Sequence, residues 1–218
     1  MHLSWYGENC FKIQTKAKRG DNDTIIVTDP FNKKIGLRPP QGQTNIVTLS
    51  NINYTKNDLK RFKGEPFTID SAGEYSIKGV NITGIESFQD DKGGELRGRN
   101  TIFTIESEGI RVCHLGNIGH VLNEEQVDNI GEVDILLIPV GREDLLTLKQ
   151  IKEIIGQLEP GIIIPMNYKV KGLKDKINGC QDFCKEFGSA RQQGETKLVI
   201  KEKNVKDLEN NLVVLKVS

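Results

Sequence analysis

The residue types that most often bind transition metals are few in this chain and widely scattered. They comprise three histidines and four cysteines: His2, His114, His120, Cys10, Cys113, Cys180 and Cys184. Cys180 and Cys184 are four residues apart in a segment that predicts a helix, so their thiols share one face. No histidine or third cysteine lies near them in the sequence to complete a tetrahedral zinc site. We therefore expect no zinc at this pair, and we expect the cysteines to be small buried apolar residues.

The elements that must position any site are strands in the first half and strand–helix units in the second. Short β-branched or aromatic runs, separated by Gly, Asn, Asp and Pro, predict strands at 3–6, 10–14, 24–28, 45–49, 74–77, 80–85, 100–105 and 110–114, with a short helix near 56–62. The glycines of KGGELRGRN, at 92–100, predict a hairpin loop.

The second half contains two continuous apolar runs, DILLIPV at 134–140 and GIIIPM at 161–166, which predict strands buried on both faces. Between them, TLKQIKEIIGQLEP places its apolar residues on one side of a helix. A further helix near 179–187 and strands at 197–201 and 212–217 complete the pattern. This order predicts an α/β fold, and no linker divides the chain, so we expect a single domain over 1–218.

Composition excludes some classes of function. The 30 basic residues balance the 30 acidic residues, so we expect no nucleic-acid partner and no attraction to an anionic membrane. The chain has no apolar run of the roughly 20 residues that span a bilayer, and it starts without the pattern of a signal peptide. Four scattered cysteines do not predict a disulfide framework. We therefore expect a cytoplasmic protein, whose oligomeric state the sequence leaves open.

Six segments of the sequence indicate a particular protein family, which is more specific than a fold class. They are WYGENCFKI, IIVTDPF, NIVTLSNINYTKND, GEYSIKGVNITGIESFQD, GRNTIFTIESEGIRVCHLGNIGHVL and DILLIPVGREDLLTLKQIKEIIGQLEPGIIIPMNYK. Over roughly residues 1–170 the chain resembles the Zn-dependent hydrolase group of the metallo-β-lactamase superfamily, which includes ascorbate-phosphate lactonase-like proteins. The resemblance implies a four-layer αββα sandwich with a site where loops gather at one sheet edge. The segment after about residue 170 has no such counterpart.

The resemblance also implies a paired metal site, and this chain departs from it at every ligand position. The family uses a His-x-His-x-Asp-His loop, a later His, an Asp after Leu-Gly and a His after Ile-Pro-Met. The corresponding residues here are Asn51, Asn53, Thr55, Lys56, Gln89, Asn117 and Asn167. Amide oxygens are weak ligands for zinc, and Lys56 would place a cation where a dication would lie. Both ligand carboxylates are replaced by neutral residues, which avoids unpaired buried charges in a metal-free site.

Other residues would surround these positions if the fold is retained. Glu8 replaces a histidine of the family, and we expect it in one polar pocket with Asp29, His114 and Tyr168. Asp29 could form an ion pair with Lys56, or it could cap its own turn before Pro30. His114 and His120 match family positions outside the ligand set, and we expect them to orient the Leu-Gly-Asn turn by hydrogen bonds.

These observations favour a catalytically silent protein of this fold, without zinc or another cofactor, that acts as a binding or scaffold protein for an unknown small ligand or protein partner. One alternative is that the polar pocket is a relic with no ligand. The other is a hydrolase of the lactonase or phosphodiesterase class that uses an altered site. The hydrolase requires a group that activates a nucleophile, and the sequence does not identify one.

Overall fold

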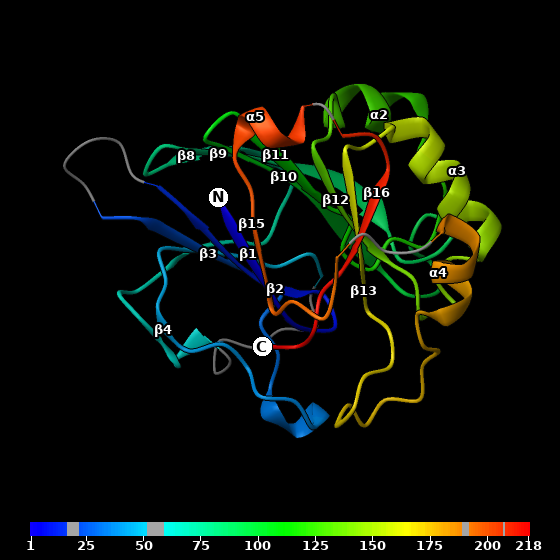
Figure 1. The fold of residues 1–218 in the computed structure, drawn as a ribbon, viewed down its shortest axis with the longest axis horizontal. Helices are drawn as coiled ribbons and strands as arrows, with labels where there is room; N and C mark the ends of the chain where they lie inside the picture. The colour runs from blue at the N-terminus through cyan, green and yellow to red at the C-terminus, as the bar shows by residue number, and fades with distance from the viewer. Residues whose placement is uncertain (17–21, 52–58, 189–191, 207) are drawn as a thin grey trace.

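The computed structural model describes residues 1–16, 22–51, 59–188, 192–206 and 208–218. Two mixed β-sheets pack face to face, and helices α2, α3 and α4 lie along the outer side of the larger sheet (Figure 1). The predicted α/β metallo-β-lactamase fold is confirmed. No helix within the described ranges is long and apolar enough to cross a membrane.

The smaller sheet has six strands in the order β15-β1-β2-β3-β5-β7. Their bounds are β1 His2–Gly7, β2 Cys10–Thr15, β3 Thr24–Thr28, β5 Ile46–Thr48, β7 Phe67–Ile69 and β15 Lys197–Val199. The pairs β15–β1, β1–β2 and β2–β3 are antiparallel, whereas the pairs β3–β5 and β5–β7 are parallel. A separate two-stranded ladder joins β4 Gly42–Gln43 to β6 Phe62–Lys63.

The larger sheet has eight strands in the order β14-β16-β13-β12-β11-β10-β9-β8. Their bounds are β8 Gly73–Ile77, β9 Val80–Phe88, β10 Arg99–Ser107, β11 Ile110–His114, β12 Ile135–Pro139, β13 Ile162–Met166, β14 Gln192–Gln193 and β16 Asn211–Val214. Strands β8 to β11 form an antiparallel meander, and β11, β12 and β13 are parallel. The carboxyl ends of these three strands therefore meet at one edge of the sheet.

Side-chain alternation divides the core into layers. Along β12, Ile135 and Leu137 face the space between the sheets, while Leu136 and Ile138 face the helices. Because both faces of β12 are buried, its sequence is an uninterrupted apolar run. A third cluster, with Val27, covers the outer face of the smaller sheet.

Within the described ranges the helices are α2 Glu124–Ile130, α3 Leu148–Leu158, α4 Gln181–Phe187 and α5 Glu202–Val205, with a 3-10 turn η1 at Lys33–Ile35. Helix α3 buries Ile151, Ile154, Ile155 and Leu158, as its apolar spacing predicts. The predictions omitted α2, although Asn123 and Gln126 form the capping box that starts it. Of the helix predicted near 56–62, residues 56–58 lie outside the described residues. Leu59 is helical, Lys60 and Arg61 form a turn, and Phe62 already begins β6, so the described part of the prediction is mostly wrong.

Candidate functional site

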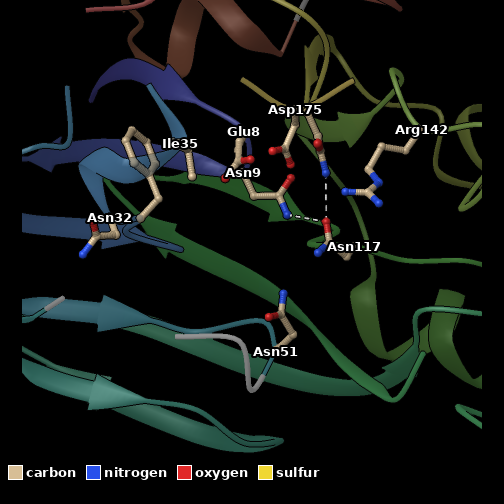
Figure 2. A pocket seen from close by; sticks show the side chains of 10 residues that line it. Glu8, Asn9, Asn32, Ile35, Asn51, Asn117, Arg142 and Asp175 are labelled. Carbon is tan, nitrogen blue, oxygen red and sulfur yellow. Dashed lines mark hydrogen bonds between the residues drawn. The ribbon is translucent and has the colours of Figure 1, made fainter. Parts of the chain in front are cut away.

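A polar pocket of about 320 Å³ opens where the carboxyl ends of several strands meet the turn between β1 and β2 (Figure 2). It is lined by Glu8, Asn9, Phe31, Asn32, Ile35, Asn51, Asn117, Arg142, Asn167 and Asp175. We call it the amide pocket, because five of its ten lining residues are asparagines. Ligands of α/β proteins commonly bind outside the carboxyl ends of sheet strands, and this position fits that rule.

Asn117 is the centre of a hydrogen-bond network on the pocket floor. Its Oδ1 accepts a hydrogen bond from Asn9 Nδ2 at 2.7 Å and another from Asn167 Nδ2 at 2.9 Å, and these two bonds are drawn in Figure 2. Its own Nδ2 lies 3.5 Å from Gln89 Oε1. Four chain segments distant in sequence are thus joined by neutral side-chain amides.

The backbone holds this network in place. Asn100 Oδ1 accepts a hydrogen bond from the Asn117 amide, and Gln89 Nε2 donates to the carbonyls of Arg97 and Arg99. Asn167 has a left-handed backbone, at φ 53°, and its amide donates to the Glu8 carbonyl. Asparagine tolerates that conformation better than most residues, so its presence after β13 suits the turn.

Glycine is required where the loop after β12 crosses Asn167. A Cβ at Gly141 would lie 2.5 Å from the Asn167 carbonyl oxygen and 2.5 Å from the Tyr168 Cα. The Gly141 amide also donates to the Asn167 carbonyl at 3.1 Å. The close approach of these two backbones fixes the side of the pocket that carries Arg142.

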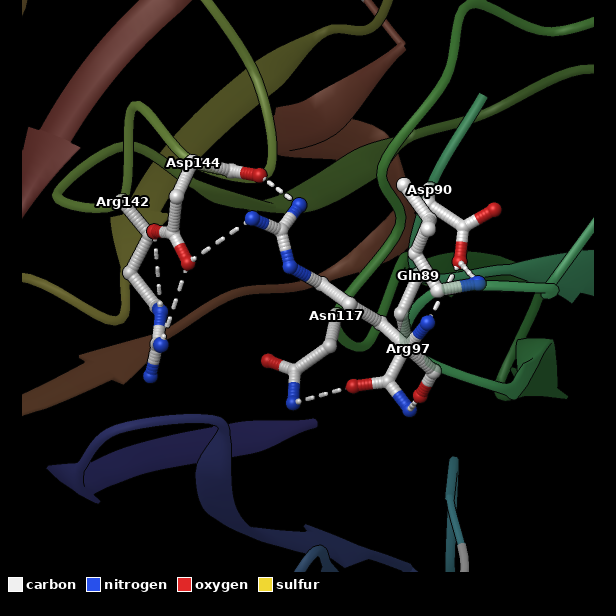
Figure 3. Close-up of polar contacts among 7 residues, drawn as sticks. Gln89, Asp90, Arg97, Asn117, Arg142 and Asp144 are labelled. Atoms are coloured by element: carbon white, nitrogen blue, oxygen red, sulfur yellow. Dashed lines mark hydrogen bonds and ion pairs between the residues drawn. The ribbon is translucent and has the colours of Figure 1, made fainter. Parts of the chain in front are cut away.

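The charged residues of the pocket are two carboxylates and one guanidinium. Burial, followed by repulsion from Asp175, raises the pKa of Glu8 to about 7, against the opposing effect of Arg142. Asp144 binds Arg142 on the rim, and it also binds Arg97 from the neighbouring loop (Figure 3). The pocket therefore presents both signs of charge above a neutral floor.

The remaining residues predicted for the site lie beneath or behind this pocket. Asp29 is buried, and its carboxylate accepts hydrogen bonds from the Ser50 amide at 2.7 Å and the Ser50 hydroxyl at 2.5 Å. His114 is fully buried, with Nε2 2.8 Å from the Asn9 carbonyl oxygen. Asn53, Thr55 and Lys56 lie outside the described residues, and so does any ion pair between Lys56 and Asp29.

Tyr168 follows Asn167 but is directed away from the amide pocket. Its ring packs against Trp5, with centroids 4.7 Å apart, and its hydroxyl donates to the Leu215 carbonyl at 3.4 Å. It borders a different hollow, formed with the last strand of the chain. His114 and His120 do not bond the Leu-Gly-Asn turn as predicted. His120 Nε2 instead accepts a hydrogen bond from the Phe88 amide at 3.2 Å, at the end of β9 beside Gln89, and its Nδ1 lies 2.8 Å from the Val121 carbonyl oxygen.

Asn9, Arg142 and Asp175 line the pocket but were not predicted from the sequence. Asn9 is adjacent to Glu8 in the β1–β2 turn, and the GENC turn motif was the available signal. Arg142 follows the strand DILLIPV, where a residue at the carboxyl end of a parallel strand is a reasonable candidate. Asp175 lies after about residue 170, in the segment that has no counterpart in the family.

The residues described here do not fit a pair of transition-metal ions. No group of three His, Cys, Asp or Glu side chains that could hold a metal is found within the described ranges. Asn51, Gln89, Asn117 and Asn167 supply amides, and three of these are bonded to one another. Zinc prefers imidazole, thiolate and carboxylate ligands, so this donor set is a poor match.

Comparison with known proteins identifies the family. Residues 2–167 match the model of the Beta-lactamase superfamily domain. A UPF0173 metal-dependent hydrolase of Archaeoglobus fulgidus is 21% identical over 200 residues, which cover 81% of this chain and 87% of that protein.

Solved structures agree with this assignment. A Thermotoga maritima protein, named as a candidate Zn-dependent hydrolase of the metallo-β-lactamase superfamily, is 37% identical with a TM-score of 0.78, and the match covers 99% of this chain and 98% of the other. An isothiocyanate hydrolase from Delia radicum gut bacteria shares the fold at 12% identity and a TM-score of 0.60, over 100% and 97% of the two chains. The strand order, the position of the pocket and these matches together show that the chain belongs to the metallo-β-lactamase superfamily.

Proposed function

We propose that this chain is a metal-independent binding protein built on the metallo-β-lactamase fold, and that it is silent as a metal-dependent hydrolase. The observation that carries the proposal is the state of Asn117 Oδ1, which accepts hydrogen bonds from both Asn9 and Asn167. An oxygen that already accepts two amide donors has no remaining lone pair directed at a metal ion. Among the described residues at ligand positions, Gln89, Asn117 and Asn167 are instead bonded to one another.

The nearby histidine and carboxylates do not compensate for the missing ligands. Asp29 is bonded to Ser50, and His114 directs its Nε2 at a backbone carbonyl beneath the floor. Glu8 and Asp175 are the two carboxylates that line the pocket among the described residues. Two carboxylates on one side of a pocket are fewer than the ligand set that a di-zinc centre needs.

The pocket suits a small polar molecule. Its volume of about 320 Å³ is at the lower end of the range for small-molecule sites. Asn9 Oδ1 is buried and has no hydrogen-bond partner within the described part of the chain. A buried acceptor of this kind favours a donor supplied by a ligand or by ordered water.

The second candidate is hydrolysis, and the names of the relatives favour it. The Archaeoglobus fulgidus protein is named as a metal-dependent hydrolase, and the Thermotoga maritima protein is named as a candidate Zn-dependent one. Within this pocket Glu8 is the group best suited to move a proton at neutral pH, because its pKa is about 7. A shared fold does not by itself transfer an activity, so the two candidates need a direct test.

The first test compares the wild-type chain with a variant that restores the family ligands. The variant carries Asn51→His, Asn53→His, Thr55→Asp, Lys56→His, Gln89→His, Asn117→Asp and Asn167→His. Added zinc should raise the melting temperature of the variant, because an ion that binds only the native state stabilises it by mass action. Zinc should leave the melting temperature of the wild-type protein unchanged. A wild-type increase as large as that of the variant would contradict the proposal.

The second test measures hydrolysis of a generic lactone and a generic phosphodiester by the wild-type protein, with zinc and with a chelator. The proposal predicts rates equal to those of a Glu8→Gln control and of buffer. Turnover that zinc increases and the chelator abolishes would favour the hydrolase. Turnover that Glu8→Gln abolishes and the chelator does not affect would instead support metal-free hydrolysis.

A further inference from the structure

Helix α4 carries two thiols that are in contact at its first turn. The Sγ atoms of Cys180 and Cys184 are 3.0 Å apart, and the Cys184 amide donates to the Cys180 carbonyl at 2.9 Å. A disulfide bond is about 2.05 Å long, so the two sulfurs need to approach by only about 1 Å to form one. Both residues are outside the amide pocket.

The ordinary interpretation of these cysteines is that they pack in the core, and it is partly correct. Cys180, Phe183, Cys184 and Phe187 have the i, i+3, i+4, i+7 spacing of an apolar helix face. Phe183 is buried and its ring packs against Phe187, with centroids 4.6 Å apart. Packing explains why the face is apolar, but it does not require two sulfurs to meet.

The two thiols differ in access to solvent. Cys180 is buried, and burial followed by the hydrogen bond with Cys184 raises its pKa. Cys184 is only half-buried, so a small reagent can approach it from solvent. This arrangement separates an accessible sulfur that reacts first from a protected sulfur that reacts second.

We infer that Cys180 and Cys184 form a reversible redox modification site, which a low-molecular-weight disulfide such as oxidised glutathione converts to an intramolecular disulfide. The contact between the two sulfurs and the accessibility of Cys184 carry this inference. The remaining cysteines are isolated: Cys10 and Cys113 are both fully buried.

The reaction consists of two exchange steps. The Cys184 thiolate attacks one sulfur of the small disulfide, which breaks that S–S bond, forms a mixed disulfide at Cys184 and releases one small thiolate. The Cys180 thiolate then attacks Cys184 Sγ, forms the Cys180–Cys184 bond and releases the second small thiolate. The two protons lost by the cysteines go to the two released thiolates. Two protein thiols are oxidised, and one small disulfide is reduced to two thiols.

The test treats the folded full-length protein with oxidised glutathione and follows intact mass and peptide maps. The expected product has lost two hydrogen atoms, retains no glutathione and contains a linked Cys180–Cys184 peptide, and dithiothreitol should reverse the change. Cys10 and Cys113 should remain alkylatable after unfolding, which makes them internal controls.

Two variants separate the steps. Cys180→Ser should hold one glutathione at Cys184, because the second thiol is missing. Cys184→Ser should react much more slowly, because only buried thiols remain, and circular dichroism checks that both variants fold. A wild-type protein that retains glutathione at Cys184, or that does not react at all, would overturn the inference. Equal oxidation at Cys10 or Cys113 would overturn it as well.

Discussion

The floor of the amide pocket and the loop at residues 89–98 are adjacent, and they satisfy buried polar atoms in opposite ways. In the loop, the Asp90 carboxylate accepts hydrogen bonds from four backbone amides, those of Lys92, Gly94, Leu96 and Arg97. On the floor, neutral side-chain amides bond to one another around Asn117. Gln89 belongs to both regions, as Figure 3 shows.

The difference shows where a carboxylate can be kept without a metal. Backbone amides provide a fixed set of donors that stabilises a buried negative charge, as at Asp90 in the loop and at Asp29, which is bonded to the Ser50 amide and hydroxyl. The floor offers only side-chain amides, which pair with each other without any charge. Because the amides around Asn117 carry no charge, this floor does not need a cation to neutralise it.

The largest loss of stability should come from forcing apart the backbone at Gly141 and the backbone at Asn167, which frame the floor of the pocket. Gly141→Ala places a methyl group 2.5 Å from the Asn167 carbonyl oxygen and 2.7 Å from the Asn178 carbonyl oxygen. Because these obstacles are backbone atoms, we expect unfolding free energy to fall by roughly 2–4 kcal/mol in urea denaturation. The matched control is Gly156→Ala on helix α3, where a Cβ meets nothing within 4 Å, and it should stabilise by about 1 kcal/mol. Equal effects at both glycines would show that the close approach at Gly141 is not structural.

A somewhat smaller change in stability is expected from Glu8, a pocket acid whose carboxylate is not stabilised by backbone amides as that of Asp90 is. Its pKa is raised from 4.5 to about 7, so the folded state holds a proton that the unfolded state loses. Stability should therefore decrease as pH rises from about 4.5 to 7, by at most about 3 kcal/mol, since each pKa unit corresponds to about 1.4 kcal/mol. Glu8→Gln should remove this part of the pH dependence in thermal melts. If wild-type and variant curves were parallel, Glu8 would not be a protonated acid in the pocket.

Asn117→Asp tests whether the floor must be neutral. The new carboxylate could still accept from Asn9 and Asn167, but it could not donate to Gln89, and it would add a charge near Glu8. We expect a loss of about 1–2 kcal/mol in unfolding free energy at pH 7. Asn129→Asp, on an exposed part of helix α2, makes the same chemical change and should have little effect. A variant as stable as the wild-type protein in the absence of metal would argue against a neutral floor.

The smallest change in global stability should follow from Asp90→Asn, because the loop is at the end of a hairpin. Burial disfavours the charged form of Asp90, but the hydrogen bonds from Arg97 and the other backbone amides outweigh it and lower the pKa. The stabilisation from this group is thus present above its unfolded-state pKa and is lost as pH falls through the lower folded value. In the variant, hydrogen exchange should accelerate at the four amides that Asp90 binds, and not in strand β12. Unchanged exchange would show that the carboxylate does not organise the loop.

The sequence predicted the fold well because its strands carry local signals. The run DILLIPV and the apolar face of TLKQIKEIIGQLEP determine β12 and α3 almost residue by residue. Helix α2 was missed because it is short and charged, and only its capping box marks it. The strands β4 and β6 were missed because each has two residues, too few for any alternation.

The site was less predictable, because a pocket depends on which loops converge in space. Asn51, Gln89, Asn117 and Asn167 were identified by family position, and the structure brings them to one place. Asn9 and Asp175 match no ligand position. Only its place beside Glu8 in the β1–β2 turn connected Asn9 to the pocket, and nothing in the sequence connected Asp175 to it. Tyr168 is next to Asn167, yet the left-handed turn at Asn167 directs its ring toward Trp5.

The central claim is that the neutral floor holds no metal, and the most direct measurement is elemental analysis of the purified protein. The protein should be loaded with excess zinc or manganese, dialysed against a mild chelator and compared with the ligand-restored variant. We predict less than about one tenth of an ion per wild-type chain, because amide oxygens are weak ligands for these metals, and about one or two ions per chain in the variant. One or two zinc, iron or manganese ions retained by the wild-type chain would contradict the account.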